Sequence, residues 1–186
     1  MLFAKALLPV FALFSVAATS FASPIAAPVP EPNELVKRAD PVTQVVQTLS
    51  DSALPLISVL TPAAATVNAQ VDAIVAVFAK ARVDILGLVD VDAVVDVDAI
   101  IDLNVNLIVK LLVALNVFGL LDLSIFAKID AAVSAYLKAL VLIKADIAVK
   151  IGKGIPLLDV NLFVTVKLIL TATVLGLLNL LGIIGL

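Results

Sequence analysis

The sequence predicts a mostly α-helical fold, a bundle of amphipathic and apolar helices, on three observations. Two segments begin with a capping residue followed by proline, Asp40-Pro41 and Thr61-Pro62, which is a common way for a helix to start. Apolar residues then recur at helical spacing behind both starts. Hydrophobic residues make up 63% of the chain and cysteine is absent, so burial of apolar side chains must hold the fold.

Residues 41–82 are predicted to form an antiparallel pair of helices. The apolar stripe of the first helix consists of Val42, Val45, Val46, Leu49, Ala53, Leu56, Ile57 and Leu60. The stripe of the second helix consists of Val67, Val71, Ile74, Val75 and Phe78. Pro55 lies inside the first helix and is expected to kink or split it, because proline removes one backbone hydrogen bond.

A second periodicity leaves an alternative open for the middle of the chain. From Ala63 to Ile151 every odd-numbered residue is apolar or glycine, and a period of two is typical of strands. Residues 83–110 are also rich in Val, Ile, Asp and Asn, which are weak helix formers. Strand content in 83–110, or a β-rich, solenoid-like segment, is therefore the alternative to an all-helical bundle.

Residues 1–22 are predicted to be a secretory signal peptide. Lys5 gives the positive start, a short apolar stretch follows, and Ser20-Phe21-Ala22 supplies small residues for cleavage after Ala22. The apolar stretch is shorter than the roughly 20 residues of a membrane span. We therefore expect the protein to be secreted.

Residues 23–38 are predicted to be a proline-rich propeptide. Prolines at this density favour extended backbone over helix or sheet. The segment ends at Lys37-Arg38, which resembles the dibasic site cut by kexin-type proteases in the fungal Golgi. Two solvated charges in a linker are the alternative. Cleavage after Arg38 would leave a single mature apolar domain, residues 39–186.

The charge of this mature domain limits its partners. Removing Lys5, Lys37, Arg38, Glu31 and Glu34 leaves 9 basic and 13 acidic residues, a net charge of −4. Such a balance gives no electrostatic reason to bind nucleic acid or anionic lipid. The sparse lysines of the second half form either an ordinary solvated face or an amphipathic surface that settles on hydrophobic material or lipid. They are Lys110, Lys128, Lys138, Lys144, Lys150 and Lys153.

The residue types available exclude most catalytic chemistry. Without histidine or cysteine the chain lacks the usual nucleophile–base pairs and zinc ligands, so we expect no enzyme and no cofactor. One acidic cluster offers oxygen ligands of the kind that Ca²⁺ prefers. It consists of Asp90, Asp92, Asp96, Asp98 and Asp102. We interpret this cluster as a solvated acidic edge that keeps an apolar segment soluble. A Ca²⁺ site is the alternative, and no metal site is expected elsewhere in the chain.

The C-terminal segment, residues 168–186, contains no charged residue. Its 19 residues are enough to span a bilayer, although threonines, asparagine and glycines interrupt them. A helix packed against the rest of the bundle is the favoured interpretation. Insertion into a membrane is the alternative.

The mature domain opens with Asp40-Pro41-Val42-Thr43-Gln44-Val45-Val46 and continues into Val-, Ala- and Leu-rich segments without cysteine. This layout resembles the fungal hydrophobic surface-binding and cell-wall galactomannoprotein family. The resemblance implies a helical fold and adsorption to hydrophobic surfaces or binding of fatty acids.

These patterns lead to one expected function and two alternatives. We expect a secreted, non-enzymatic fungal protein, extracellular or in the cell wall, that binds or coats hydrophobic surfaces or lipids. The first alternative is a membrane-inserting or membrane-anchored protein that uses residues 168–186. The second is a structural protein that self-associates through the alternating segment 83–109.

Overall fold

The computed structural model describes residues 40–62, 65–90, 95–118 and 123–177. The predicted processing sites at Ala22, Lys37 and Arg38, and with them the signal peptide and propeptide, lie outside the described residues. The same holds for the end of the apolar C-terminal segment, residues 178–186.

The described residues form seven helices and no strand, which confirms the predicted helical bundle. Four of the helices are long and three are short. In chain order they are α1 (Pro41–Ser58), α2 (Val67–Leu86), α3 (Val97–Asn116), α4 (Leu123–Ile143), α5 (Ile147–Gly154), α6 (Leu157–Thr165) and α7 (Ile169–Val174).

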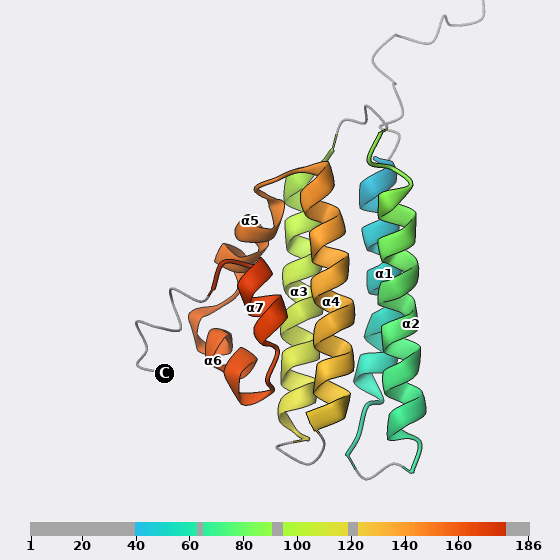
Figure 1. Ribbon diagram of the computed structural model, residues 1–186, viewed down its shortest axis with the longest axis vertical. Helices are drawn as coiled ribbons and strands as arrows, with labels where there is room; N and C mark the ends of the chain where they lie inside the picture. Colours follow the sequence, from blue (N-terminus) through green and yellow to red (C-terminus); the bar gives the residue numbers. More distant parts are fainter. Residues whose placement is uncertain (1–39, 63–64, 91–94, 119–122, 178–186) are drawn as a thin grey trace, which may run out of the picture. The chain divides into compact units, whose positions relative to one another are not determined.

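The four long helices pack as two stacked pairs (Figure 1). Helix α1 lies antiparallel to α2, as predicted, and each then packs on a second long helix, α1 on α3 and α2 on α4. Both stacked pairs are parallel: the N-terminal turns of α1 and α3 meet through Asp40 and Asp96, and those of α2 and α4 through Asp72 and Lys128. The faces α1–α3 and α2–α4 are therefore on opposite sides of the bundle.

The short helices cover the remaining side. Helix α7 packs on α4, α6 packs on α3, and α5 contacts both α3 and α4. Helices α3 and α4 themselves are not close neighbours along their lengths. The three C-terminal helices therefore close the side on which the four long helices would otherwise leave the core open (Figure 1).

The helix starts follow the predicted chemistry only in part. Asp40 caps α1: its Oδ1 accepts from the backbone N of Val42 at 3.0 Å. The predicted start at Thr61-Pro62 is wrong, because α2 begins at Val67 after Thr66 and leaves that pair in the connection. Pro55 does not split α1, which continues to Ser58. It lies within the last turn, where only one backbone hydrogen bond is lost.

The strand alternative for 83–110 is wrong for the residues that the structure describes, since 83–90 and 95–110 lie in α2, α3 and the turns that flank them. The alternation arises because polar residues recur every four positions, and four is an even number. Asp98, Asp102, Asn106 and Lys110 form one exposed row of α3. Ile100, Asn104, Ile108 and Leu112 are also even-numbered but lie on the buried side.

The apolar segment 168–186 folds back onto the bundle as far as it is described. Its first ten residues contain the six-residue helix α7, with Leu168, Ala172 and Leu175 buried. Among the described residues, no helix has both the length and the apolar character needed to cross a membrane.

Candidate functional site

The acidic cluster singled out in the sequence is placed around the start of α3. Asp96 caps this helix, because its side chain accepts a hydrogen bond from the backbone N of Ala99 at 3.2 Å. Asp98 lies exposed in the first turn, where a negative charge interacts favourably with the positive end of the helix dipole. Asp90 and Asp102 are exposed, and Asp92 lies outside the described residues. In the described part of the chain, no three acidic side chains come close enough together to hold a metal ion.

An apolar groove lies between the C-terminal halves of α1 and α3. Its volume is about 610 Å³. The lining residues are Leu54, Pro55, Ile57, Ser58, Leu60, Val109, Lys110, Val113, Ala114 and Val117. Because α1 and α3 are parallel, their C-terminal ends lie together and contribute side chains to the same groove. We call this hollow the α1–α3 groove.

The chemistry of the α1–α3 groove is almost wholly apolar. Val113 and Val117 are 52% and 66% exposed, so the groove keeps branched apolar side chains in water. The Ser58 hydroxyl donates to the backbone O of Pro55 at 2.7 Å, which leaves its donor already used. Among the described lining residues only Lys110 is charged. An apolar chain bound here would displace water from the lining, and the Ser58 hydroxyl would keep its hydrogen bond within α1.

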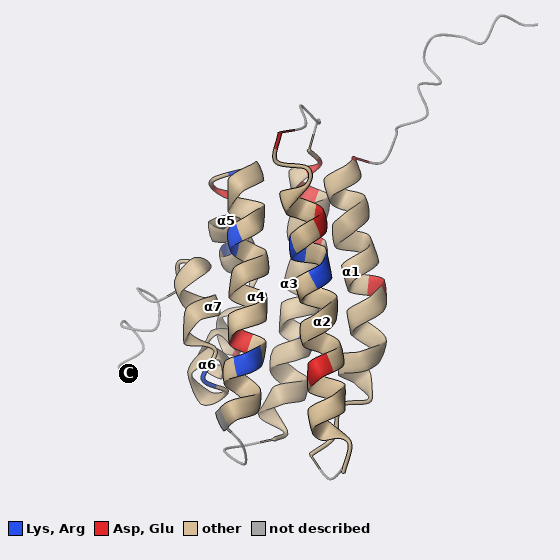
Figure 2. Ribbon diagram, turned by 45° about the vertical axis from the view of Figure 1, so that its right-hand side comes forward, with Lys and Arg blue, Asp and Glu red and all other residues tan. Residues whose placement is uncertain are grey.

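The opposite side of the bundle carries two smaller depressions between α2 and α4, of about 390 and 230 Å³. They adjoin, because Arg82 and Ala135 line both. The other lining residues are Val75, Ala79, Lys128, Ala131 and Ala132 in the larger, and Leu86, Lys138, Ala139 and Leu142 in the smaller. We call this surface the α2–α4 face. Figure 2 shows how sparse charge is around it, as isolated coloured bands on otherwise tan helices.

The charged residues that line the α2–α4 face are Arg82, Lys128 and Lys138, and one carboxylate, Asp72, lies at its rim. Lys128 Nζ lies 3.0 Å from Oδ1 of Asp72, an exposed pair at the rim. Arg82 and Lys138 are exposed and make no ion pair within the described residues. The sequence singled out Lys110, Lys128 and Lys138 but not Arg82, and it could not show that two of these lysines share a face with an arginine from another helix.

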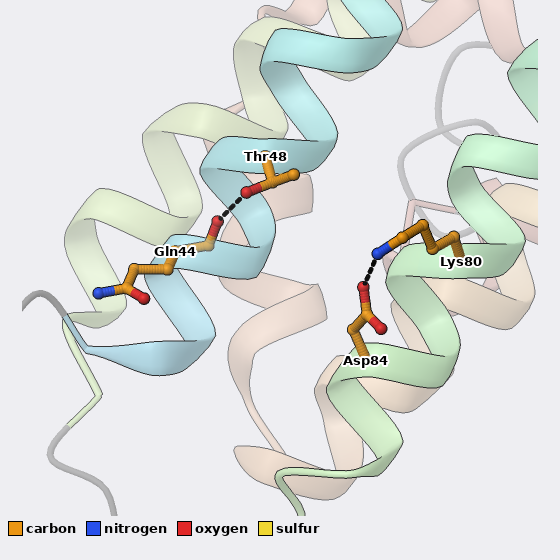
Figure 3. A network of polar contacts seen from close by, with 4 residues as sticks. All are labelled: Gln44, Thr48, Lys80 and Asp84. Carbon is orange, nitrogen blue, oxygen red and sulfur yellow. Dashed lines mark hydrogen bonds and ion pairs between the residues drawn. The ribbon is translucent and has the colours of Figure 1, made fainter.

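The seam between α1 and α2 has only a small depression, in contrast to the two surfaces described above. Its depression measures only about 60 Å³. Three of the polar residues beside it make contacts within their own helices (Figure 3). Thr48 Oγ1 donates to the backbone O of Gln44 at 2.8 Å, and Lys80 Nζ lies 2.6 Å from Asp84 Oδ2. This seam therefore offers much less room than the α1–α3 groove or the depressions of the α2–α4 face.

One buried polar pair was not predicted from the sequence. The Tyr136 hydroxyl donates to Asn104 Oδ1 at 3.0 Å, and Asn104 Nδ2 donates to the backbone O of Ile100 at 2.8 Å. The tyrosine ring also packs edge-on against Phe78. Burial raises the pKa of Tyr136 far above the usual value, against a smaller opposing effect of the Asn104 hydrogen bond. This pair joins α3 to α4 inside the core, and neither residue lines the α1–α3 groove or the α2–α4 face.

The geometry thus offers two surfaces of different chemistry on opposite sides of one bundle, one apolar and one apolar with cations. Neither could be located from periodicity, because an apolar stripe does not reveal how far two helices stand apart. No family model matches the chain, and no curated protein or solved structure gives a significant match.

Proposed function

We propose that this chain is a secreted, non-enzymatic fungal surface protein, extracellular or in the cell wall, that binds hydrophobic surfaces or lipids. The observation that carries the proposal is the α1–α3 groove, whose lining is apolar except for Ser58 and Lys110. The resemblance of the first turn of the mature domain to fungal hydrophobic surface-binding proteins points in the same direction.

The size and lining of the α1–α3 groove suit an apolar chain. Its volume of about 610 Å³ lies within the range of roughly 300–1,000 Å³ that is typical of small-molecule sites. A bound chain would cover the exposed flanks of Val113 and Val117, and burial of apolar area is the main source of affinity in such sites. A flat hydrophobic material would meet the same valines at the rim.

A fluorescent probe tests the groove directly. We expect the uncharged dye N-phenyl-1-naphthylamine to brighten on binding to the purified protein. The substitution Val117→Gln should weaken its binding about fivefold, because roughly 1 kcal/mol of apolar contact is lost. Val83→Gln is the matched control: Val83 is 65% exposed, Val117 is 66% exposed, and Val83 lies on α2 outside the groove. Equal weakening by both substitutions would refute the groove as the binding site.

The two alternative functions give different results in simple assays. Carbonate extraction of membranes from the producing cells would leave a membrane-inserted protein in the pellet, whereas the proposed protein is released. A self-assembling protein would bind thioflavin and sediment at working concentrations, whereas we expect a helical species that does neither.

A further inference from the structure

The α2–α4 face combines cations with apolar side chains in a way that the net charge of the chain hides. Among the described lining residues of both depressions, Arg82, Lys128 and Lys138 are charged and none is acidic. The whole chain has a net charge of −3, which argues against an anionic partner. At physiological salt, however, charges more than about 8–10 Å apart are largely screened from each other. The charged side chains of the face itself therefore decide which partner it attracts.

Arg82 and Lys138 are the two cations available to a partner. Both line the smaller depression, one from α2 and one from α4, and neither makes an ion pair within the described residues. Lys128 is already paired, because its Nζ lies 3.0 Å from Oδ1 of Asp72. A guanidinium group presents a planar fork that matches phosphate oxygens, and an ammonium group beside it adds a second charge.

Large apolar side chains surround these two cations. Leu86 and Leu142 line the same depression and are 39% and 61% exposed, and Val83 on the adjoining surface of α2 is 65% exposed. Exposed leucines next to lysine or arginine side chains are typical of helices that lie at a membrane interface. The leucines lie below the lipid headgroups, and the charged ends of the long lysine and arginine side chains lie among the headgroups.

We propose that the α2–α4 face docks on an anionic lipid surface, with Arg82 and Lys138 contacting lipid phosphates while Leu86 and Leu142 enter the interface. This inference rests on the proposed lipid function, but it uses the side of the bundle opposite the α1–α3 groove. It differs from the expectation, drawn from net charge alone, that anionic lipid has no electrostatic reason to bind, and the experiment below decides between the two.

The dimensions of the face favour a lipid surface over a helix of a partner protein. One turn of helix with its side chains occupies roughly 400 Å³, from a diameter of about 10 Å and a pitch of 5.4 Å. The two depressions, about 390 and 230 Å³, would hold less than two turns.

Vesicle flotation tests the proposal with two variants of equal net charge. Wild-type protein should float with phosphatidylcholine vesicles that contain phosphatidylglycerol, and much less with pure phosphatidylcholine. The double substitution Arg82→Gln/Lys138→Gln should weaken binding to the anionic vesicles about twenty-fivefold, since each cation at such a surface contributes about fivefold. Lys153→Gln/Lys167→Gln removes two exposed lysines of the C-terminal region, away from both surfaces, and should leave binding within about twofold.

Several results would overturn the proposal. They are equal loss in both double variants, equal binding to both kinds of vesicle, and binding to anionic vesicles that does not fall as salt is raised. A dimer of the wild-type protein that dissociates in the Arg82→Gln/Lys138→Gln variant would assign the face to a second copy instead. Circular dichroism checks that each variant is folded, and the salt dependence of the wild type needs no variant. Dye binding in the α1–α3 groove, measured on the same samples, separates failure of this inference from failure of the proposed function.

Discussion

Helices α1–α4 are 18 to 21 residues long, whereas α5, α6 and α7 have 8, 9 and 6 residues. Isolated helices shorter than about 12–15 residues are marginal in water, so the two regions face different physical problems. Each long helix buries an apolar stripe over several turns. Each short helix has at most two and a half turns and needs particular contacts with its neighbours.

Those particular contacts are visible in the C-terminal region. The buried carboxylate of Asp130 on α4 accepts from the backbone N of Leu170 at 2.9 Å and from both N and Oγ1 of Thr171 at 2.7 Å, which fixes the start of α7. Helix α5 approaches the end of α7 so closely that a Cβ at Gly152 would lie 2.3 Å from the backbone O of Leu175. Both regions bury apolar side chains, but the short helices α5 and α7 also depend on contacts made by single atoms of Asp130 and Gly152.

The largest effect is therefore expected at Gly152. Gly152→Ala places a methyl group against the backbone of Leu175, and we expect the free energy of unfolding to fall by about 3 kcal/mol. Gly87→Ala is the control in the long-helix region, because its added Cβ meets Asp84 O at an ordinary 3.4 Å and its φ of −68° suits alanine. It should leave stability unchanged or slightly higher. Urea unfolding followed by circular dichroism measures both, and a Gly152→Ala variant as stable as Gly87→Ala would contradict the close approach.

The next largest effect is expected at Asp130. Asparagine in its place keeps one acceptor oxygen but presents an amide donor where α7 also offers donors, so at least one buried N–H of Leu170 or Thr171 loses its partner. We expect Asp130→Asn to cost about 2 kcal/mol and to speed hydrogen exchange in α7 more than in α1. Asp72→Asn removes an exposed carboxylate paired with Lys128 and should change stability by less than about 0.5 kcal/mol. Uniform exchange rates in α1 and α7 of the Asp130 variant would show that the carboxylate is not specific to α7.

The same division explains which parts of the fold can be predicted from the sequence. Helix α1 is predictable because its cap, its N-terminal proline and its apolar stripe all indicate the same structure from Asp40 onward. Helix α7 carries no comparable local signal, because the residues that place it, Asp130 on α4 and Gly152 on α5, lie on other helices. Gly152 lies inside α5, at a contact with the end of α7 that the local sequence does not reveal.

The candidate surfaces were less predictable than the fold. A list of lysines and a net charge contain no information on which side chains from different helices meet. Arg82 and Lys138 are 56 residues apart in the chain and line one depression only because α2 and α4 run parallel. Asn104 is a similar case, since nothing in the local sequence shows that the helix turns this polar side chain inward to Tyr136.

A smaller effect tests the one buried polar pair described between the long helices. Tyr136→Phe leaves Asn104 Oδ1 buried without its donor, and we expect a loss of about 1 kcal/mol. Replacing both partners, as Tyr136→Phe/Asn104→Leu, should cost less than the sum of the single substitutions, because no buried polar group is then left unpaired. Additive losses in this double-mutant cycle would mean that the two side chains do not interact.

Tyr136 also makes the bundle sensitive to alkali. Because burial raises its pKa in the folded state, the folded protein keeps a proton that the unfolded chain loses near pH 10. Its contribution is therefore fully present below about pH 10 and is lost as pH rises further. Tyr136 is the only tyrosine of the chain, so tyrosinate absorbance should appear together with unfolding and not before it. Tyrosinate absorbance in the folded protein near pH 10 would contradict its burial.

The smallest effect concerns the turns that end α6 and α7. Both helices end with a left-handed residue, Lys167 with φ of 58° and Gly176 with φ of 73°. In each case the next residue, Leu168 or Leu177, donates its backbone N to the oxygen five positions back. Glycine adopts this conformation without strain, so Lys167→Gly should raise stability by about 0.5 kcal/mol, while Gly176→Ala should lower it by about 1 kcal/mol. A Cβ at Gly176 meets no atom closer than 3.6 Å, which leaves backbone strain as the cause of that loss. A Lys167→Gly variant less stable than the wild type would mean that the lysine side chain contributes more to holding α6 than its backbone strain costs.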